Sequence, residues 1–353
     1  MNTLTSDAIE LLKSLIATPS LSKEEDDTAN LLKQFLTERG VTVNRHLNNI
    51  WATNKHFDPS KPTILLNSHH DTVKPNDGYT KDPFTPIMED GQLFGLGSND
   101  AGGPLTSLLA TFVHFYPQAN MSYNLLMAAT AEEEISGDHG IASILDKIPE
   151  ISCAIVGEPT QMRMATAEKG LMVLECTARG RSGHAARDEG KNAIYIAMDD
   201  INWFKTHRFE KISDTLGPVK MTVTVVNAGS QHNVVPDSCT FTVDIRSTDA
   251  YTNSEILEVL PQEIASEVTA RSIRLKPSSI PVEHPLVQAG LSMGIATYGS
   301  PTLSDQSLLS VPSLKMGPGM SARSHTPDEF IRIEEIEDGI ATYINLLDLV
   351  LND

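Results

Sequence analysis

The chain has 353 residues, of which 40% are hydrophobic and 21% are charged, and its formal net charge is −19. This length is enough for two globular domains. The acidity argues against nucleic acid as a partner, because phosphate binding needs clustered Lys and Arg. No apolar run approaches the ~20 residues of a membrane span, so no membrane segment is expected.

Cysteine usage and the N-terminal segment indicate the compartment. The chain has three cysteines, an odd and small number without metal-like spacing. This argues against a disulfide framework and fits a reducing environment. Residues 1–7 contain neither the basic nor the apolar region of a signal peptide. We therefore expect a cytoplasmic protein.

The first part of the chain alternates between helical apolar spacing and short strand-like runs, as α/β domains do. Gly40 is a natural stop for the second helix, and Asp90-Gly91 is a favoured hairpin turn. In order, the predicted elements are helices at 5–16 and 24–39, strands at 41–43, 50–52 and 63–66, the hairpin, a helix at 104–115, and strands at 124–130 and 153–157.

The pattern changes after Glu158-Pro159-Thr160. Two β-α-β-type halves follow, and they predict a small ferredoxin-like domain at 164–276, inserted into a larger domain that comprises 1–163 and 277–353. The elements predicted after residue 163 are strands at 171–178, 219–226, 239–246 and 313–316, and helices at 193–206, 253–268, 285–298 and 333–350.

His69 and Asp71 lie just past the buried strand predicted at 63–66. The carboxyl ends of such strands are where α/β folds place ligands. Alternation along an extended segment points residues two positions apart to the same side. His69 can therefore bind a metal while Asp71 fixes its tautomer. A hydrogen-bonded turn is the alternative, and His70, which points away, is interpreted as structural.

Further acidic segments follow other strand-like runs. Asp100 lies in a Gly-rich turn, Glu132-Glu133-Glu134 follows 124–130, and Glu158 follows 153–157, while His325 lies near the other end of the chain. Histidines and carboxylates without cysteine suit zinc or a similar divalent ion with open coordination positions. The alternative for the three glutamates is a solvated charge run, and the glycines themselves are interpreted as a tight strand–helix turn.

Taken in order along nearly the whole chain, these segments resemble the dinuclear zinc aminoacylase/carboxypeptidase family. That family contains acetylornithine deacetylase, succinyl-diaminopimelate desuccinylase and glutamate carboxypeptidase. The resemblance implies an α/β fold, with a mixed-sheet zinc-peptidase catalytic domain and an inserted ferredoxin-like α+β domain that serves as lid and dimerisation domain. Segments 82–84 and 157–160 resemble the acetylornithine deacetylase branch. Ala101-Gly102-Gly103 departs from the family, which commonly has Lys-Gly there.

The resemblance also assigns roles at the centre. Two divalent ions are implied, zinc first, with cobalt or manganese also compatible. Asp100 would bridge the ions, Glu133 would be the general base, and Asp71 would orient the first histidine. The implied metal ligands are His69, Asp100, Glu134, Glu158 and His325.

Residues outside the metal ligands are implied to contact the substrate. His184 resembles the lid histidine that stabilises the oxyanion in the partner subunit of a homodimer, with a surface-loop histidine as the alternative. Asn233 and Arg246 resemble contacts to the substrate carboxylate, and a strand-edge ion pair is the alternative for Arg246. Gly317 and Gly319 resemble a loop whose backbone amides approach that carboxylate.

The function implied is metal-dependent hydrolysis of an N-acyl amino acid, a small molecule. The enzyme would remove acetyl or succinyl from an amino acid such as ornithine or citrulline, in arginine biosynthesis. A metallo-dipeptidase or aminopeptidase of the same family is the alternative within enzymes. A non-catalytic binding protein with the same fold is the alternative outside them, although every expected ligand and Glu133 are present.

Overall fold

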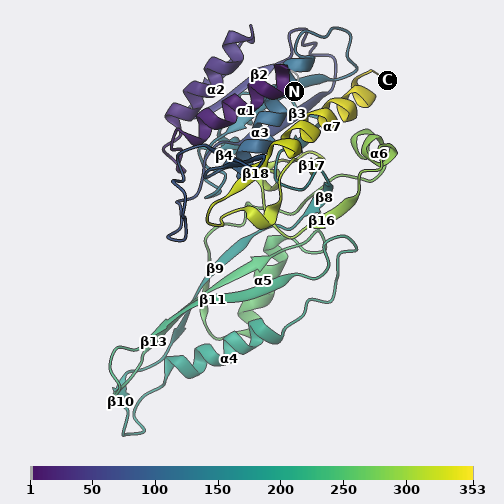
Figure 1. The fold of residues 1–353 in the computed structure, drawn as a ribbon. Helices are drawn as coiled ribbons and strands as arrows, with labels where there is room; N and C mark the ends of the chain where they lie inside the picture. Colours follow the sequence, from purple (N-terminus) through teal and green to yellow (C-terminus); the bar gives the residue numbers. More distant parts are fainter. Residues whose placement is uncertain (1–2, 353) are drawn as a thin grey trace. The chain divides into compact units, whose positions relative to one another are not determined.

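A computed structural model describes residues 3–352 of the chain (Figure 1). The chain divides into two compact units, and each is described by itself. Unit 1 comprises Met1–Thr166, Ser279–Tyr298 and Ser304–Asp353, and unit 2 comprises Ala167–Ser278 and Gly299–Leu303. Among the described residues, no helix is long and apolar enough to cross a membrane.

A nine-stranded sheet in the order β1-β2-β6-β3-β7-β17-β8-β15, with β16 beside β8, forms the centre of unit 1. Strand β3 is parallel to both β6 and β7, whereas β2 is antiparallel to β6, so the sheet is mixed as predicted. The strands are β1 Asn44–His46, β2 Asn49–Thr53, β3 Thr63–His69, β6 Asn124–Thr130, β7 Cys153–Val156, β8 Met164–Glu168, β15 Ser278–Ser279, β16 Thr297–Ser300 and β17 Ser313–Lys315.

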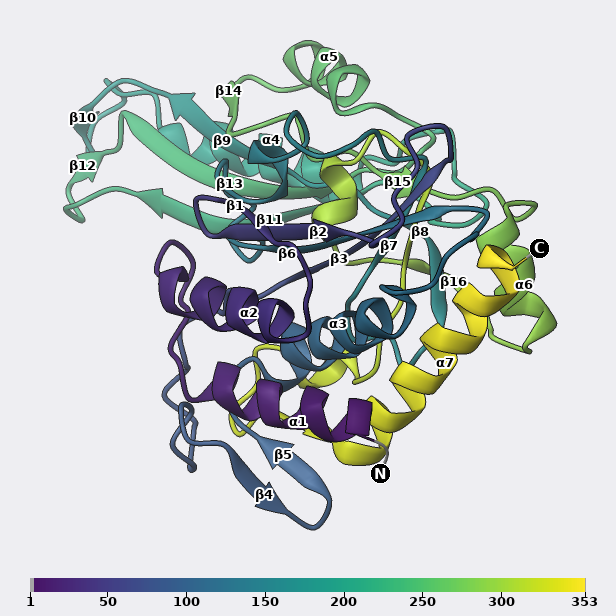
Figure 2. The same cartoon turned by 90° about the horizontal axis from the view of Figure 1, so that it is seen from above.

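Helices cover one face of this sheet, where α1, α2, α3 and α7 lie together (Figure 2). The largest core cluster lies here and includes Leu32, Leu66, Phe112 and Leu347. The other elements of unit 1 are a small sheet and short turns. Bounds are α1 Thr3–Ile16, α2 Asp26–Glu38, α3 Gly103–Phe115, α6 Pro285–Ser292, α7 Ile333–Leu351, β4 Ile87–Glu89, β5 Gln92–Phe94, β18 Phe330–Arg332, η1 Ser98–Gly102, η2 Ile141–Ser143, η3 Asp305–Leu308 and η4 Ser321–Arg323.

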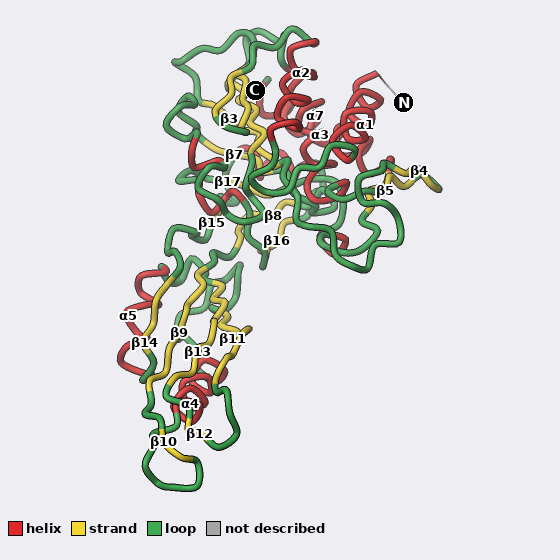
Figure 3. The backbone as a smooth tube through the Cα atoms, turned by 90° about the vertical axis from the view of Figure 1, so that its left-hand side faces the viewer, coloured by secondary structure: helices red, strands yellow, loops and turns green. Residues whose placement is uncertain are grey.

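Unit 2 has the β-α-β-β-α-β order, and its four-stranded sheet runs β11-β13-β9-β14 (Figure 3). This is the ferredoxin-like arrangement. Alternate residues of β9 and β13 are buried, and they meet apolar residues of both helices in a separate core. The elements are β9 Met172–Arg179, β10 Gly183–His184, α4 Ala193–Thr206, β11 Lys220–Ala228, β12 Val234–Val235, β13 Ser238–Arg246, α5 Asn253–Glu263 and β14 Glu267–Ala270.

Two predicted helices end earlier than their apolar spacing indicates. The helix expected at 253–268 ends at Glu263, because the Asp200 carboxylate accepts the N–H groups of Ala265 and Ser266 and the chain continues as β14. The helix expected at 285–298 ends at Ser292, before Gly294 takes a φ of 78°. The strand expected at 41–43 is also wrong, since β1 begins at Asn44.

Candidate metal centre

His69 is the last residue of β3, and it is 1% exposed between the parallel neighbours β6 and β7. Its Nδ1 lies 3.0 Å from the backbone oxygen of Asp71 and 3.4 Å from Asp71 Oδ1. Both neighbours are acceptors, so Nδ1 carries the proton of the neutral ring. Nε2 is then the atom that can bind a metal ion, as the pairing of His69 with Asp71 predicts.

Asp100 lies between the two histidines. Its Oδ1 is 3.3 Å from His69 Nε2, and its Oδ2 is 3.8 Å from His325 Nε2. The turn that carries it begins with Gly97 in a left-handed conformation, and the Asp100–Ala101 peptide bond is cis. The two distances show that each oxygen of the Asp100 carboxylate faces a different imidazole, which is the arrangement expected of a bridging ligand.

The glutamates complete two sides of this centre. Glu134 Oε2 is 3.0 Å from His325 Nε2. On the other side, Glu158 Oε1 is 3.7 Å and Glu133 Oε2 is 3.9 Å from His69 Nε2. Glu133 and Glu134 lie three and four residues after β6, and Glu158 lies two residues after β7, so the parallel strands bring them to one edge of the sheet.

The donor set fits divalent ions. Ligand atoms of His69, Asp100 and Glu134 lie within 4.8 Å of one another, as do those of His69, Glu133 and Glu158. Zinc bonds of ~2.0–2.2 Å place two ligands of one ion up to ~4 Å apart, so small side-chain adjustments would close each set. The donors are imidazole and carboxylate, which suits zinc with open positions.

The electrostatics also favour cations. Burial, together with neighbouring carboxylates, raises the pKa of Glu133 well above its ordinary value and raises the pKa of Glu158 to about 8. Burial alone would lower the pKa of His69, but the bonds to Asp100 and Asp71 raise it well above the usual range. Because carboxylates this close repel one another, nearby positive charge is needed to keep them ionised.

His325 is supplied by the chain after η4 and is more than half exposed. Its hydrogen bond to Glu134 raises the pKa of the imidazole to about 9. The residue has a φ of 59°, a conformation uncommon outside glycine. This backbone geometry belongs to the loop that turns the imidazole toward Glu134 and Asp100.

His70 and Glu132 lie beside the centre. The ring nitrogens of His70 contact Thr28 Oγ1 at 2.9 Å and the backbone oxygen of Asn48 at 2.9 Å, a structural role. Glu132, which has no predicted role, lies 3.3 Å from His139 Nδ1 and accepts the N–H of that residue. It thereby helps to fold the loop that follows Glu133 and Glu134.

Gly317 and Gly319 pack against the backbone near the ligands. A Cβ on Gly317 would lie 2.5 Å from the backbone oxygen of Glu158, and one on Gly319 would lie 2.5 Å from Asn99 Oδ1. The Gly317 N–H already donates to Thr160 Oγ1 at 3.0 Å. A substrate carboxylate would have to displace that bond to use this amide.

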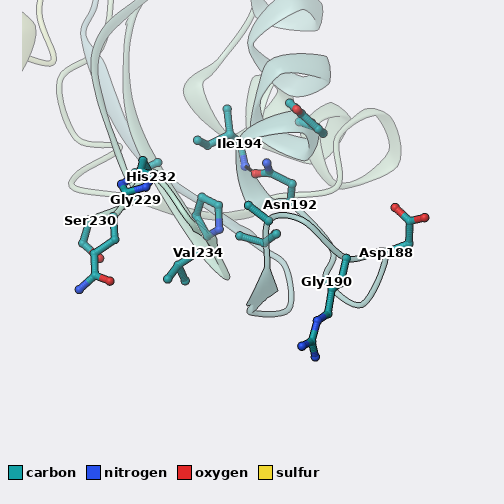
Figure 4. Close-up of a pocket in the computed structure, with 15 residues that line it drawn as sticks. Asp188, Gly190, Asn192, Ile194, Gly229, Ser230, His232 and Val234 are labelled. Atoms are coloured by element: carbon teal, nitrogen blue, oxygen red, sulfur yellow. Dashed lines mark hydrogen bonds between the residues drawn. The ribbon is translucent and has the colours of Figure 1, made fainter.

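His184 and Asn233 lie together in unit 2. His184 pairs with Val234 in the two-stranded antiparallel β10–β12 ribbon, and Ala185 donates its N–H to the backbone oxygen of Asn233 at 3.0 Å. An open cavity of about 860 Å³ adjoins this ribbon, and Asn192 and His232 are among its lining residues (Figure 4).

Arg246 lies at the opposite end of β13 from the β10–β12 ribbon. Its Nε and Nη2 donate to the two oxygens of Asp244 at 2.8 and 3.0 Å. The ion pair named as the alternative is therefore present, and it uses two of the five guanidinium N–H groups. His184 and Asn233 are adjacent to the Ser238 end of the same strand.

Three further residues near the centre carry no sequence signal of their role. Glu329 and Asn99 hydrogen-bond the turn and loop around Asp100. Asp305, in η3, accepts the hydroxyl of Thr130 at 2.7 Å, and burial raises its pKa to about 6. Only the position of Glu329 beside the His325 segment could have drawn attention to it.

The chain is similar to a known protein family and to several known enzymes. Residues 65–349 match the family described as peptidase family M20/M25/M40. Acetylornithine deacetylase from Klebsiella pneumoniae (strain 342) is 29% identical over 93% of this chain and 94% of its own length. Succinyl-diaminopimelate desuccinylase from Cereibacter sphaeroides is 29% identical over 75% of this chain and 74% of its own.

A solved structure shows the same fold over the whole length. A tripeptidase from Staphylococcus aureus aligns with 98% of this chain and 98% of its own, with a TM-score of 0.80 and 19% sequence identity. At this identity the likeness concerns the fold alone.

Proposed function

We propose, on the premise that this chain belongs to peptidase family M20/M25/M40, that it is a metal-dependent N-acyl amino acid deacylase. Family membership makes it a metallohydrolase that acts on amides. The finer proposal is removal of acetyl or succinyl from an amino acid such as ornithine or citrulline, in arginine biosynthesis in the cytoplasm. The observation that supports metal-dependent hydrolysis is the position of the Asp100 carboxylate. One of its oxygens faces His69 and the other faces His325.

Two divalent ions would be held by this centre. His69 and Glu158 would hold one, Glu134 and His325 would hold the other, and Asp100 would contact both. Zinc suits these nitrogen and oxygen donors best, and cobalt or manganese would also be accepted. When bound, such ions polarise a carbonyl oxygen and lower the pKa of water.

Glu133 is proposed as the general base. It lies on the His69 side of the centre, and burial raises the pKa of its carboxyl. A raised pKa suits a group that takes a proton from water at neutral pH and then gives it to the leaving amine. Asp71 acts through His69 and is a positioning residue.

The substrate proposal rests on the relatives and on unit 2. The two curated relatives act, by their names, on acetylornithine and on succinyl-diaminopimelate. Both names describe acyl groups on amino acids, whose carboxylates would be bound by Arg246 of one copy and Asn233 of a second copy. Gly319 would approach the same carboxylate through its backbone, as would Gly317 if its bond to Thr160 opened.

A homodimer would bring His184 to the centre of a second copy. The nine residues of β13 are eight steps of ~3.3 Å, or about 26 Å from end to end. This is too far for one small substrate to contact both Arg246 and the His184 ribbon of one copy. Edge strand β11 and helix α4 of unit 2 also expose apolar side chains that a partner could cover. These are Tyr195, Met198, Val225 and Val226.

Two other functions remain as competing hypotheses. A dipeptidase or aminopeptidase of the same family would need a group that binds a free α-amine, and the fold of the tripeptidase shows that the scaffold occurs in peptidases. A non-catalytic binding protein would bind metal and acyl amino acid without turnover.

The test measures amine release from a panel of N-acetyl- and N-succinyl-ornithine, -citrulline and -diaminopimelate, with dipeptides beside them. Each is assayed after chelation and again with zinc or cobalt restored. Metal-dependent release from one acyl amino acid is expected. Turnover of dipeptides alone would favour the peptidase, and metal binding without any turnover would favour the binding protein.

A further inference from the structure

Glu329 is a buried carboxylate that hydrogen-bonds one turn of the backbone. It lies four residues after His325 and is 2% exposed. Its Oε1 accepts the N–H groups of Asn99 and Asp100, both at 2.8 Å, and its Oε2 accepts that of Gly97 at 3.1 Å. A buried carboxylate is costly unless it is hydrogen-bonded, and these charge-assisted bonds are among the stronger kinds.

The turn that Glu329 contacts lacks regular helical geometry. Gly97 has a φ of 74°, and Asp100 has φ −121° and ψ 100°, just before α3 begins. The N–H groups of Gly97, Asn99 and Asp100 precede α3 and therefore have no partner within that helix. Glu329 supplies acceptors for all three, so the course of the backbone through Asp100 depends on a side chain from the other end of the sequence.

We propose that Glu329 is a positioning residue that couples the two candidate ligands Asp100 and His325. The segment that supplies His325 as a ligand also fixes, through Glu329, the turn that points Asp100 at both histidines. The inference rests on the proposed metal centre. Glu329 is assigned a positioning role rather than that of a ligand because both of its carboxylate oxygens already accept backbone N–H groups.

Asp328 provides a matched control, because it is the adjacent carboxylate and also accepts backbone N–H groups. Its Oδ1 accepts those of Thr80 and Lys81 at 2.8 and 2.9 Å. That loop carries none of the proposed ligands. Loss of Asp328 therefore removes a comparable set of bonds without touching the turn of Asp100.

The test is a cobalt(II) titration of the chelated full-length protein, followed by visible absorption, which reports coordination number, and by metal analysis. Wild-type protein is expected to bind two equivalents. In Glu329→Gln, the side-chain N–H₂ group faces backbone N–H donors, so the turn of Asp100 loses acceptors. The affinity for at least one of the two cobalt ions should therefore fall ~10–100-fold, which is the usual effect of losing a residue that orients metal ligands. The absorption band should change, and Asp328→Asn should bind and absorb as wild type does.

The outcomes separate the two levels of the proposal. If wild-type protein binds no cobalt, the metal centre itself is wrong. If wild type binds two equivalents and Glu329→Gln does the same with equal affinity and spectrum, only the role of Glu329 is overturned. If Glu329→Gln does not fold, Glu329→Asp is used in its place, because the shorter aspartate side chain keeps the charge but reaches fewer N–H groups. Cobalt affinity equal to that of wild type in Glu329→Asp would also overturn the proposed role of Glu329.

Discussion

The carboxylate of Asp71 accepts the backbone N–H of Glu133 at 3.0 Å and, through its second oxygen, that of Glu134 at 3.2 Å. The first oxygen also lies 3.4 Å from His69 Nδ1. One buried side chain thus fixes both the imidazole and the start of the glutamate loop. This gives Asp71 a larger part in the centre than orientation of one histidine.

Asp71→Asn should therefore weaken metal binding more than loss of one hydrogen bond would. An amide has one acceptor oxygen and would turn its N–H₂ toward a backbone donor. We expect the affinity for zinc or cobalt to fall ~10–100-fold, measured by competition with a chromophoric chelator. Ser22→Ala is the control, because Ser22 donates to Asp71 Oδ2 at 2.7 Å and its loss should cost only about 1 kcal/mol of stability. Equal metal affinity in Asp71→Asn and wild type would contradict the prediction.

Glu133 and Glu134 should separate into two phenotypes although they are neighbours. Glu133→Gln cannot accept a proton, so kcat should fall ~10²–10⁴-fold with metal content unchanged. Glu134→Gln removes an ionised group 3.0 Å from His325 Nε2, so metal content should fall first. This difference is tested by measuring the metal content and kcat of both variants at saturating and at limiting zinc. Loss of metal from Glu133→Gln but not from Glu134→Gln would exchange the two assignments.

Local patterns were enough to predict most of the fold and the strand ends at which the candidate ligands lie. The apolar run before His69 and the acidic residues after 124–130 and 153–157 predicted strand ends at one edge, and β3, β6 and β7 are indeed parallel neighbours. Alternation predicted the pairing of His69 with Asp71. The contact of Asp71 with Glu133 could not be predicted in this way, because it depends on how two loops from neighbouring strands meet.

Residues whose partners are distant in sequence were missed. Glu329 meets Asp100 across 229 positions, and Asp305 meets Thr130 across 175. No periodicity or spacing within one segment reports such contacts. For the same reason, the predicted insertion at 164–276 did not include Gly299–Leu303, which belong to unit 2.

Complementation tests whether His184 acts on the partner's centre. Two differently tagged variants, His184→Ala and Glu133→Gln, are co-expressed, and the heterodimer is isolated by both tags. If His184 acts across a two-fold dimer, one site carries both defects and the other carries none, so about half of wild-type activity should return. Near-zero activity in a confirmed heterodimer would mean that each His184 serves its own copy, and a monomer in sedimentation would contradict the dimer.

Asp305 should make stability depend on pH in a predictable direction. Burial raises its pKa from the ordinary 3.8 to about 6, so the folded chain binds this proton more tightly than the unfolded chain does. The free-energy cost of burying the ionised carboxylate is therefore absent below about pH 4, where the group is protonated in both states. This cost grows as pH rises to about 6 and is constant above that. Asp305→Asn removes the titration, so its free energy of unfolding relative to wild type should rise over the same interval, by at most about 3 kcal/mol.

Urea unfolding of chelated protein at several values between about pH 4.5 and 7.5 measures this difference, and groups that do not interact with Asp305 cancel between variant and wild type. Chelation matters because bound cations near Asp305 would favour its ionised form. Asp58→Asn is the control: the Asp58 carboxylate accepts the hydroxyl and the N–H of Ser60, and these bonds lower the pKa of the carboxyl. The stability difference for Asp58→Asn should thus stay flat over this range. A flat difference for Asp305→Asn as well would mean that the fold holds this carboxyl without an energetic penalty.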